Sequence, residues 1–332
     1  MMQGDIDMQS YQRSASWWGL LMVAALAAGV GGVQAQGAQY PSKKITIVVG
    51  FTAGGFADTL ARFVGQKLGD KLGQAVVVEN RGGAGGNTAA SAVTKADADG
   101  HTLLVTTTAI SINASLYQKL DYSLDQLAII AMPGSSAETF AVPADRPGML
   151  KEFVDWAKGR EVTFATAGVG SGSHLAAEHF YRNLAKIKAS HVPFRGGSLA
   201  LQAALGGQVD AITASFGTNA HVQSGKLKGL AVASAKRNPV LPNVPTFAEA
   251  GYPGFEAGSW VGFFVPAKTD PAIVAKLNSA INEIVTTKAN EEHLTKIGYT
   301  LTVRPVADSQ KFLKDEVAKW GQWVKTVGIS VK

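Results

Sequence analysis

The chain has 332 residues and no cysteine, with 46% apolar and 17% charged side chains and a formal charge of +6. This length suggests about two domains, and the lack of cysteine excludes disulfide frameworks, thiolate metal sites and cysteine nucleophiles. A mean hydropathy of +0.08 excludes a polytopic membrane protein. The chain contains no cluster of lysine and arginine with interleaved aromatic residues, so we expect no nucleic-acid partner.

Residues 1–35 have the features of a secretory signal peptide. Arg13 precedes a 17-residue apolar run that leads into Val33-Gln34-Ala35, a small-x-small cleavage pattern. A membrane anchor is the alternative, but a run of that length diluted with alanine and glycine is marginal for spanning. Two aspartates near the start are unusual in such a leader, and translation from Met8 would remove them. We therefore expect export to a bacterial periplasm.

The first part of the mature chain alternates strand and helix patterns. The β-branched run Ile45–Val49 predicts a buried strand, followed by a glycine-rich loop and a periodic helix that Asp58 is placed to cap. Further strands are expected at 76–78 and 102–106, with a helix of small residues between them that ends near Lys95. This order predicts a parallel sheet covered by helices.

The same alternation restarts further along the chain. The predicted elements are strands at 162–165, 189–194, 211–214 and 230–233, and helices at 153–158, 175–184, 199–205, 271–285 and 309–327. Ser259–Val265 is expected to cross back to the first part. The sequence therefore predicts an α/β protein with two lobes and a ligand cleft between them. The first lobe is discontinuous, residues 36–140 and 262–332, and the second is residues 141–261.

Two glycine-rich loops are the candidate binding elements. Thr52–Phe56 and Val169–Ser173 each join a predicted strand to a helix, whose N-terminus presents free N–H groups and partial positive charge to a carboxylate or phosphate. Glycine lets a ligand approach the backbone, and the hydroxyls of Thr52, Ser171 and Ser173 add donors. Each loop alone is as well explained as a tight turn that needs a positive φ. Their occurrence at corresponding places in both lobes favours binding.

No local sequence motif indicates an enzyme. Gly168-Val-Gly-Ser-Gly-Ser173 matches neither the dinucleotide-binding fingerprint nor G-x-S-x-G, and Arg81–Gly86 lacks the Lys-Ser/Thr of a phosphate-binding P-loop. His174 and His179 are five residues apart, so they point in different directions on a helix. We therefore expect neither a metal nor a cofactor. An exported α/β hydrolase of a carboxylate ester or amide, with catalytic residues spread over several loops, is the alternative of another class.

The other candidates are one arginine and four aromatic residues. Arg195 follows a predicted strand and is placed either to pair with a ligand carboxylate in the cleft or to lie at the surface. The candidate cleft walls, each of which taken alone is more often a core residue, are Phe51, Phe56, Phe216 and Trp260.

Nine segments, in order along the mature chain, resemble one family. They are residues 40–51, 54–62, 76–86, 99–104, 168–175, 191–197, 206–210, 225–231 and 244–252. The set includes Val76-Val-Val-Glu-Asn-Arg-Gly-Gly-Ala-Gly-Gly86 and His191-Val-Pro-Phe-Arg-Gly-Gly197. It is similar to the periplasmic substrate-binding proteins of tripartite tricarboxylate transporters, also called the Bug family, over essentially the whole mature chain.

The resemblance implies a class II periplasmic-binding-protein fold that closes on a small organic carboxylate. It implies a partner in the membrane, either a permease or a sensor receptor, and we expect a monomer. It places a ligand carboxylate against the loops after the first strand of each lobe, with the loop after the third strand, residues 106–111, as a further wall. The candidate ligand-binding set is therefore Phe51, Thr52, Ala53, Gly54, Gly55, Phe56, Thr107, Thr108, Gly170, Ser171, Gly172, Ser173, Arg195, Thr213 and Ser215.

Two departures from the family pattern bear on the ligand. Gly50 and Ala53 stand where members commonly have proline, so the first loop is expected to be less rigid. Members that accept amino acids tend to carry an aspartate in the strand that follows Asp210, whereas Ile212–Phe216 has none. A buried ammonium group would then lack its counter-charge, which costs affinity. We therefore expect a carboxylate without an amine, either a mono- or dicarboxylate or an aromatic acid.

Overall fold

The computed structural model describes Met1 and residues 40–331. The predicted signal peptide, apart from Met1, lies outside the described residues. The chain divides into two compact units, Met1–Ser42 and Lys43–Lys332, and the fold described below is that of the second unit.

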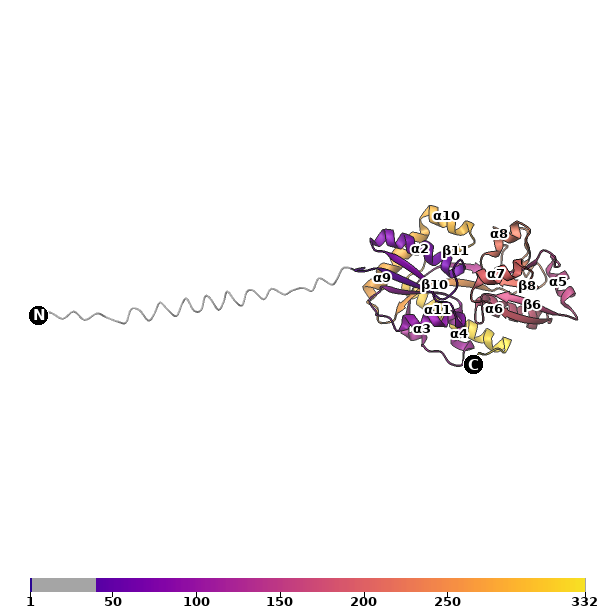
Figure 1. Ribbon diagram of the computed structural model, residues 1–332, viewed down its shortest axis with the longest axis horizontal. Coiled ribbons are helices and arrows are strands. Elements are labelled where there is room, and N and C mark those ends of the chain that lie inside the picture. The colour runs from indigo at the N-terminus through magenta and orange to yellow at the C-terminus, as the bar shows by residue number, and fades with distance from the viewer. Residues whose placement is uncertain (2–39, 332) are drawn as a thin grey trace. The chain divides into compact units, whose positions relative to one another are not determined.

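The second unit contains two β-sheets (Figure 1). The first sheet has six strands in the order β11-β4-β10-β3-β1-β2: β1 Ile45–Val49, β2 Val76–Asn80, β3 Thr102–Thr107, β4 Leu127–Ala137, β10 Gly258–Pro266 and β11 Thr300–Leu301. The second has five strands in the order β7-β6-β8-β5-β9: β5 Thr139–Pro143, β6 Glu161–Thr166, β7 Lys188–Pro193, β8 Ala211–Ala214 and β9 Leu227–Val232. We call the parts of the chain built around these sheets the first and second lobes.

The helices cover the faces of the two sheets (Figure 1). They are α2 Phe56–Leu72, α3 Asn87–Thr94, α4 Ala109–Leu116, α5 Leu150–Ala157, α6 Gly172–Glu178, α7 Gly197–Leu205, α8 Thr218–Gln223, α9 Pro271–Thr286, α10 Lys288–Lys296 and α11 Val306–Val327. Short 3-10 turns lie at Ala84–Gly86 and Leu124–Gln126, and a π-helical segment at His179–Leu184 continues α6. Within the described part of the chain, no helix combines the length and the apolar character needed to cross a bilayer.

The strand directions confirm the predicted α/β class but show that neither sheet is purely parallel. β1 runs parallel to β2 and β3, and β6 runs parallel to β7 and β8, as strands joined through helices must. β10 is antiparallel to both β3 and β4, and β5 is antiparallel to both β8 and β9. These antiparallel strands are the ones next to the passages between the lobes.

The chain crosses from the first sheet to the second at a single residue, Glu138, which separates β4 from β5. It returns at the start of β10, where Gly258 pairs with Ala137. The Glu138 N–H donates to the carbonyl of Ala257 at 2.9 Å, and its carbonyl accepts from the N–H of Ala233 at 2.8 Å. The outgoing and returning segments are thus hydrogen-bonded side by side at this point.

Helix α2 shows how the first lobe is held together. Leu60, Val64 and Leu68 recur at helical spacing and are buried, and the helix ends at Gly73, whose φ of 68° suits glycine. The expected cap is wrong in one respect, because the N-cap residue is Gly55. Asp58 lies inside the first turn, and its carboxylate reaches back to accept the N–H of Gly54 at 2.8 Å.

A second correction concerns the segment 106–111, which was expected to be a loop. β3 continues to Thr107, and α4 begins at Ala109. Nearly the whole of α4 is buried, including the polar Ser111 and Asn113, so its sequence lacks the one-sided apolar pattern of a surface helix. The helix packs against α11, where Ile112 and Leu116 share a core cluster with Trp320.

Candidate ligand-binding site

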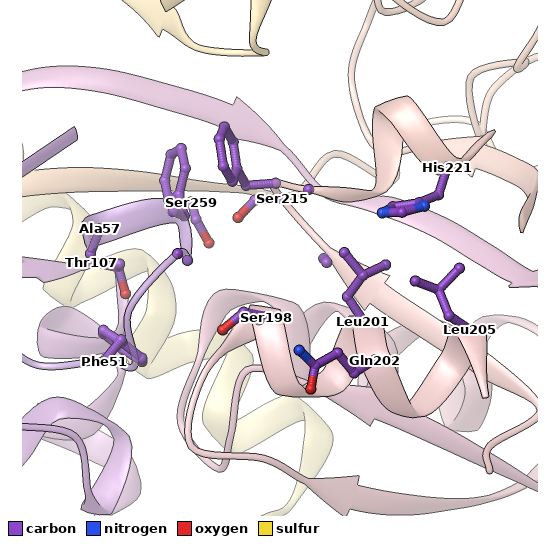
Figure 2. A pocket seen from close by; sticks show the side chains of 17 residues that line it. Phe51, Ala57, Thr107, Ser198, Leu201, Gln202, Leu205, Ser215, His221 and Ser259 are labelled. Atoms are coloured by element: carbon purple, nitrogen blue, oxygen red, sulfur yellow. The ribbon is translucent and has the colours of Figure 1, made fainter. Parts of the chain in front are cut away.

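A cavity of about 250 Å³ lies where elements of both lobes meet (Figure 2). Its walls come from the end of β1, the start of α2, β3 and β10 in the first lobe, and from α7, the end of β8 and α8 in the second. The lining residues are Phe51, Gly54, Gly55, Phe56, Ala57, Thr107, Gly197, Ser198, Leu201, Gln202, Leu205, Ala214, Ser215, Phe216, Gly217, His221 and Ser259. Its size suits a small organic molecule, since pockets for drug-sized ligands span about 300–1,000 Å³.

Two helices begin at this cavity, one from each lobe. α2 starts at Phe56 after Gly55, and α7 starts at Gly197 after Gly196. Neither N-cap residue has a side chain, so no side-chain cap covers the first N–H groups of either helix. Uncapped N–H groups and the positive end of the helix dipole favour an anion at such a place.

The walls of the cavity carry no lysine, arginine, aspartate or glutamate. Their polar side chains are hydroxyls, one amide and the imidazole of His221. Figure 2 shows His221 and Leu205 at the end of the cavity away from Phe51 and Thr107. An anion here would be held by N–H and O–H donors, and an ammonium group would meet no carboxylate on the wall.

Aromatic rings from both lobes form the apolar wall. The Phe56 ring stacks on Tyr299 with centroids 5.0 Å apart, and Phe216 lies 5.1 Å from Tyr299 and 5.9 Å from Phe56. The Tyr299 hydroxyl donates to the Phe56 carbonyl at 2.5 Å. Phe216 follows β8 of the second lobe, so this cluster is also an apolar contact between the lobes.

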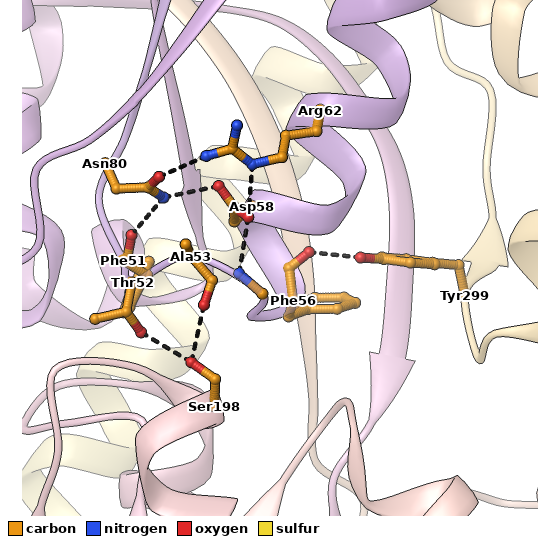
Figure 3. A network of polar contacts seen from close by, with 10 residues as sticks. Phe51, Thr52, Ala53, Phe56, Asp58, Arg62, Asn80, Ser198 and Tyr299 are labelled. Atoms are coloured by element: carbon orange, nitrogen blue, oxygen red, sulfur yellow. Dashed lines mark hydrogen bonds and ion pairs between the residues drawn. The ribbon is translucent and has the colours of Figure 1, made fainter.

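The loop after β1 is held by a buried carboxylate (Figure 3). Asp58 accepts from Gly54 N–H at 2.8 Å, from Arg62 Nε at 3.0 Å and from Asn80 Nδ2 at 2.8 Å, and Asn80 also donates to the Phe51 carbonyl at 2.9 Å. Burial alone would raise the pKa of Asp58, but the hydrogen bonds from Arg62, Gly54 and Asn80 outweigh it and lower the pKa below its usual value. These bonds brace the loop, in which Gly50 and Ala53 stand where the sequence resemblance led us to expect proline.

The same loop is joined directly to the second lobe. Thr52 N–H donates to the Arg195 carbonyl at 3.3 Å, and Thr52 Oγ1 lies 3.2 Å from Ser198 Oγ. Ser198 Oγ donates in turn to the Ala53 carbonyl at 3.0 Å (Figure 3). Thr52 and Ala53 therefore lie beside the cavity, where they hold the lobes together, and they are not part of its wall.

The second predicted loop, Gly170–Ser173, does not line the cavity. Ser171 Oγ donates to the Gly168 carbonyl at 2.7 Å and lies 3.0 Å from Ser173 Oγ, so these hydroxyls are satisfied within the loop. The backbone of Gly172 passes directly behind the wall, because a β-carbon placed on it would lie 2.5 Å from Ser259 Oγ. The loop thus supports the cavity from behind.

The remaining predicted residues divide between the wall and other places. Thr107 and Ser215 line the cavity. Thr108 is buried, and its Oγ1 accepts from Trp260 N–H at 2.9 Å. Thr213 is buried within β8. Arg195 is exposed and lines a separate cavity of about 400 Å³.

Helix α7 is the part of the wall that the sequence prediction missed, together with His221 and Ser259. The signal was present, because Gly196-Gly197-Ser198 joins a predicted strand to a predicted helix just as the two chosen loops do. Trp260, a candidate wall, instead lies in the core of the first lobe. The described residues contain no group of three or more His, Asp or Glu that would hold a metal ion.

Comparison with known proteins identifies the family. Residues 60–329 match the family model TctC, described as tripartite tricarboxylate transporter family receptor. The chain belongs to the TctC family. It is 35% identical over 301 residues to the protein BugT of Bordetella pertussis, an alignment that covers 88% of this chain and 92% of BugT. The predicted family is therefore confirmed.

Solved TctC-type structures share the fold. The periplasmic binding protein BugD is 31% identical with a TM-score of 0.84, covering 88% of this chain and 100% of BugD. MatC from Rhodopseudomonas palustris, solved with bound malate, is 34% identical with a TM-score of 0.81, and the alignment covers 86% of this chain and 100% of MatC. Another R. palustris protein, solved with adipate, is 30% identical with a TM-score of 0.84, and the alignment covers 88% of this chain and 99% of that protein. The two-lobed fold and the prediction of a binding protein rather than an enzyme are confirmed.

Proposed function

We propose that this TctC protein captures a small carboxylate that has no amino group, with a dicarboxylate favoured, and delivers it to a membrane permease. The observation that carries the proposal is the pair of uncapped helix N-termini, of α2 and α7, at a cavity without charged side chains. One carboxylate would accept N–H groups from both helices and the hydroxyl hydrogen of Thr107, whose Oγ1 accepts from Ala109 N–H at 3.3 Å. The lack of an acidic wall residue disfavours an amino acid.

The groups at the far end of the cavity would bind a second carboxylate. His221 and Gln202 are its polar groups beyond the helix N-termini, and Leu201 and Leu205 line the space with them. A chain of methylene groups would contact the leucines while its second carboxylate meets the imidazole or the amide. The malate bound to MatC and the adipate bound to the other R. palustris protein are both dicarboxylates.

Closure would follow from contacts to both lobes at once. By the sheets that they form, we assign residues 43–137 and 258–331 to the first lobe and residues 139–257 to the second, in place of the predicted boundaries after residues 140 and 261. A ligand between α2 and α7 stabilises the arrangement in which Thr52 and Ser198 meet, because it contacts both helices only when the lobes are together. The predicted leader, residues 1–35, would direct the protein to the periplasm, where the closed form would dock on the permease.

A thermal-shift screen tests the proposal. The purified protein is unfolded and refolded to remove carried-over ligand, then heated with mono-, di- and tricarboxylates, aromatic acids and amino acids. A ligand present at about 100 times its dissociation constant adds about 2.7 kcal/mol and should raise the midpoint by several degrees. A shift with non-amino carboxylates supports the proposal. A shift confined to amino acids, or none with refolded protein, would refute it.

A further inference from the structure

A buried glutamate stands directly behind the cavity wall. Glu138, the crossover residue, has a fully buried side chain. Its Oε1 lies 2.7 Å from Ser259 Oγ, and Ser259 lines the cavity. Its Oε2 has no hydrogen-bond partner among the described residues. The position of a β-carbon on Gly172 is 3.2 Å from Oε1, so the second loop closes the carboxyl group off from the other side.

Within the part of the chain that the structure describes, no cation forms a hydrogen bond or an ion pair with Glu138. On α11, Glu316 accepts from Trp260 Nε1 and Trp320 Nε1, and Lys319 pairs with Glu316. On the α6 segment, Glu178 pairs with Arg182, and the ring of His174 accepts from the Gly170 N–H. Among the described residues, neither Glu256, which is close in sequence to the returning strand, nor His221, on the cavity wall, forms a hydrogen bond or ion pair with Glu138. Lys228 on β9 donates to the Arg146 carbonyl.

We propose that Glu138 is a positioning residue that holds its proton and donates it to Ser259 Oγ, which turns the Ser259 hydroxyl hydrogen toward an anion in the cavity. This inference rests on the proposed function. A hydroxyl that accepts from Glu138 is free to donate, whereas one that must donate to an ionised Glu138 presents only lone pairs to the ligand. Loss of this single proton therefore removes a donor from the cavity and puts a negative charge behind its wall.

Burial raises the pKa of Glu138 to about 8, and the hydrogen bond that Ser259 Oγ can donate to the ionised carboxylate offsets this only in part. The carboxyl group is thus neutral at pH 7 in the folded protein and ionised at the same pH in the unfolded chain. The folded state binds the extra proton, so the contribution to stability is complete below about pH 4.5. It is lost as the pH rises to about 8.

The first arm of the test measures this proton without any ligand. Denaturant unfolding of the wild-type protein and of Glu138→Gln is followed from about pH 5 to about pH 9. The amide keeps the neutral shape, so we expect the variant to lose less stability than the wild type as the pH rises. If the unfolding free energies of the wild type and the variant change with pH in parallel, Glu138 is ionised in the folded protein over this whole pH range, and the inference is overturned.

The second arm measures anion binding, with adipate as the probe. We expect the dissociation constant of the wild type to rise above about pH 8 by up to about tenfold per pH unit. Glu138→Gln should remove this rise. Ser259→Ala should weaken binding at pH 7, where Glu138→Gln retains it. The control Glu256→Gln changes an exposed glutamate close in sequence to Ser259 and should keep the wild-type dependence of adipate binding on pH. A second control, His221→Asn, measures any contribution of the imidazole to that dependence.

The outcomes distinguish the two proposals. If adipate binds the wild type with a flat pH profile, or if Glu138→Gln keeps the wild-type rise, the positioning role is wrong while carboxylate capture stands. If neither adipate nor any other acid of the panel binds the refolded wild type, the proposed function fails, and with it the role assigned to the Ser259 hydroxyl. The ligand-free arm then still reports whether Glu138 holds its proton.

Discussion

The hydroxyl of Ser198 donates to the carbonyl of Ala53 at 3.0 Å, although the two residues lie 145 positions apart and belong to different lobes. This bond joins the loop after β1 to the first turn of α7. The two helix N-termini that face the cavity are thereby held next to each other. In the proposed function, ligand binding and lobe closure therefore depend on the same few residues.

Replacing Ser198 with alanine should weaken ligand binding without unfolding the protein. The substitution removes the bond to Ala53 that holds the two lobes together at the cavity, and a hydrogen bond contributes about 1 kcal/mol, or about fivefold in affinity. Calorimetric titration with adipate measures the change. Thr326→Ala removes an exposed hydroxyl on α11 and should leave the dissociation constant unchanged. Equal affinity in Ser198→Ala and wild type would exclude Ser198 from the site.

Gly196→Ala should oppose closure. A β-carbon at this position would lie 2.0 Å from Thr52 Oγ1, which is closer than real atoms approach, and 3.1 Å from the backbone nitrogen of Thr52, which is tighter than most contacts. The lobes must separate to accommodate it, so we expect at least about a tenfold loss of adipate affinity, equivalent to about 1.4 kcal/mol.

Small-angle scattering of the adipate-saturated Gly196→Ala protein should show a larger radius of gyration than the saturated wild type. Gly148→Ala is the matched control, because its β-carbon would meet only the flexible side chain of Lys228. Wild-type affinity and size in Gly196→Ala would mean that the contact between Thr52 and Gly196 plays no part in binding.

Asp58→Asn should destabilise the first lobe. The buried carboxylate accepts three hydrogen bonds, and an amide oxygen cannot replace both carboxylate oxygens, so we expect a loss of about 1–3 kcal/mol at pH 7. Because the pKa of Asp58 is lowered in the folded protein, its contribution is present above about pH 4 and is lost as the pH falls further. Denaturant unfolding at pH 7 and at about pH 3 should therefore show a smaller difference between variant and wild type at the lower pH.

The stacked pair of the half-buried His191 and the buried His174 predicts a loss of stability in mild acid. Burial, with a smaller contribution from the adjacent His174, lowers the pKa of His191 to about 3, and the two rings stack 4.1 Å apart. The unfolded chain takes up this proton near pH 6.5, so the contribution of His191 is complete above that pH and declines as the pH falls toward 3. His191→Gln should flatten the stability profile between about pH 6.5 and 4. Nuclear magnetic resonance that detects a charged His191 ring at pH 6 would contradict this assignment.

The sequence predicted most strands and helices because their local patterns are strong. Ile45–Val49 and Ala211–Ala214 are strands with the predicted bounds, and the helix predicted to begin at Pro271 does begin there. α4 was missed because both its faces are buried, so its residues show no amphipathic period. β4, a long strand next to the crossover, was missed as well.

The site was predicted only in part, since a loop's contacts depend on how the lobes meet. The first loop was correctly expected to adjoin a helix N-terminus, but nothing local shows that Ser198, rather than Ser171, lies opposite it. Glu138 is one unremarkable acidic residue in the sequence. Its burial follows from the crossing of two strands that are distant along the chain.

A pair of ligands that differ in a single group tests the central claim most directly. Adipate and 2-aminoadipate have the same two carboxylates, and only the second carries an ammonium group. Calorimetric titration of the refolded protein at pH 7 should give a dissociation constant for adipate at least about tenfold lower, because the cavity wall has no carboxylate for the ammonium group and Glu138 behind it is neutral. Tighter binding of 2-aminoadipate would contradict the account.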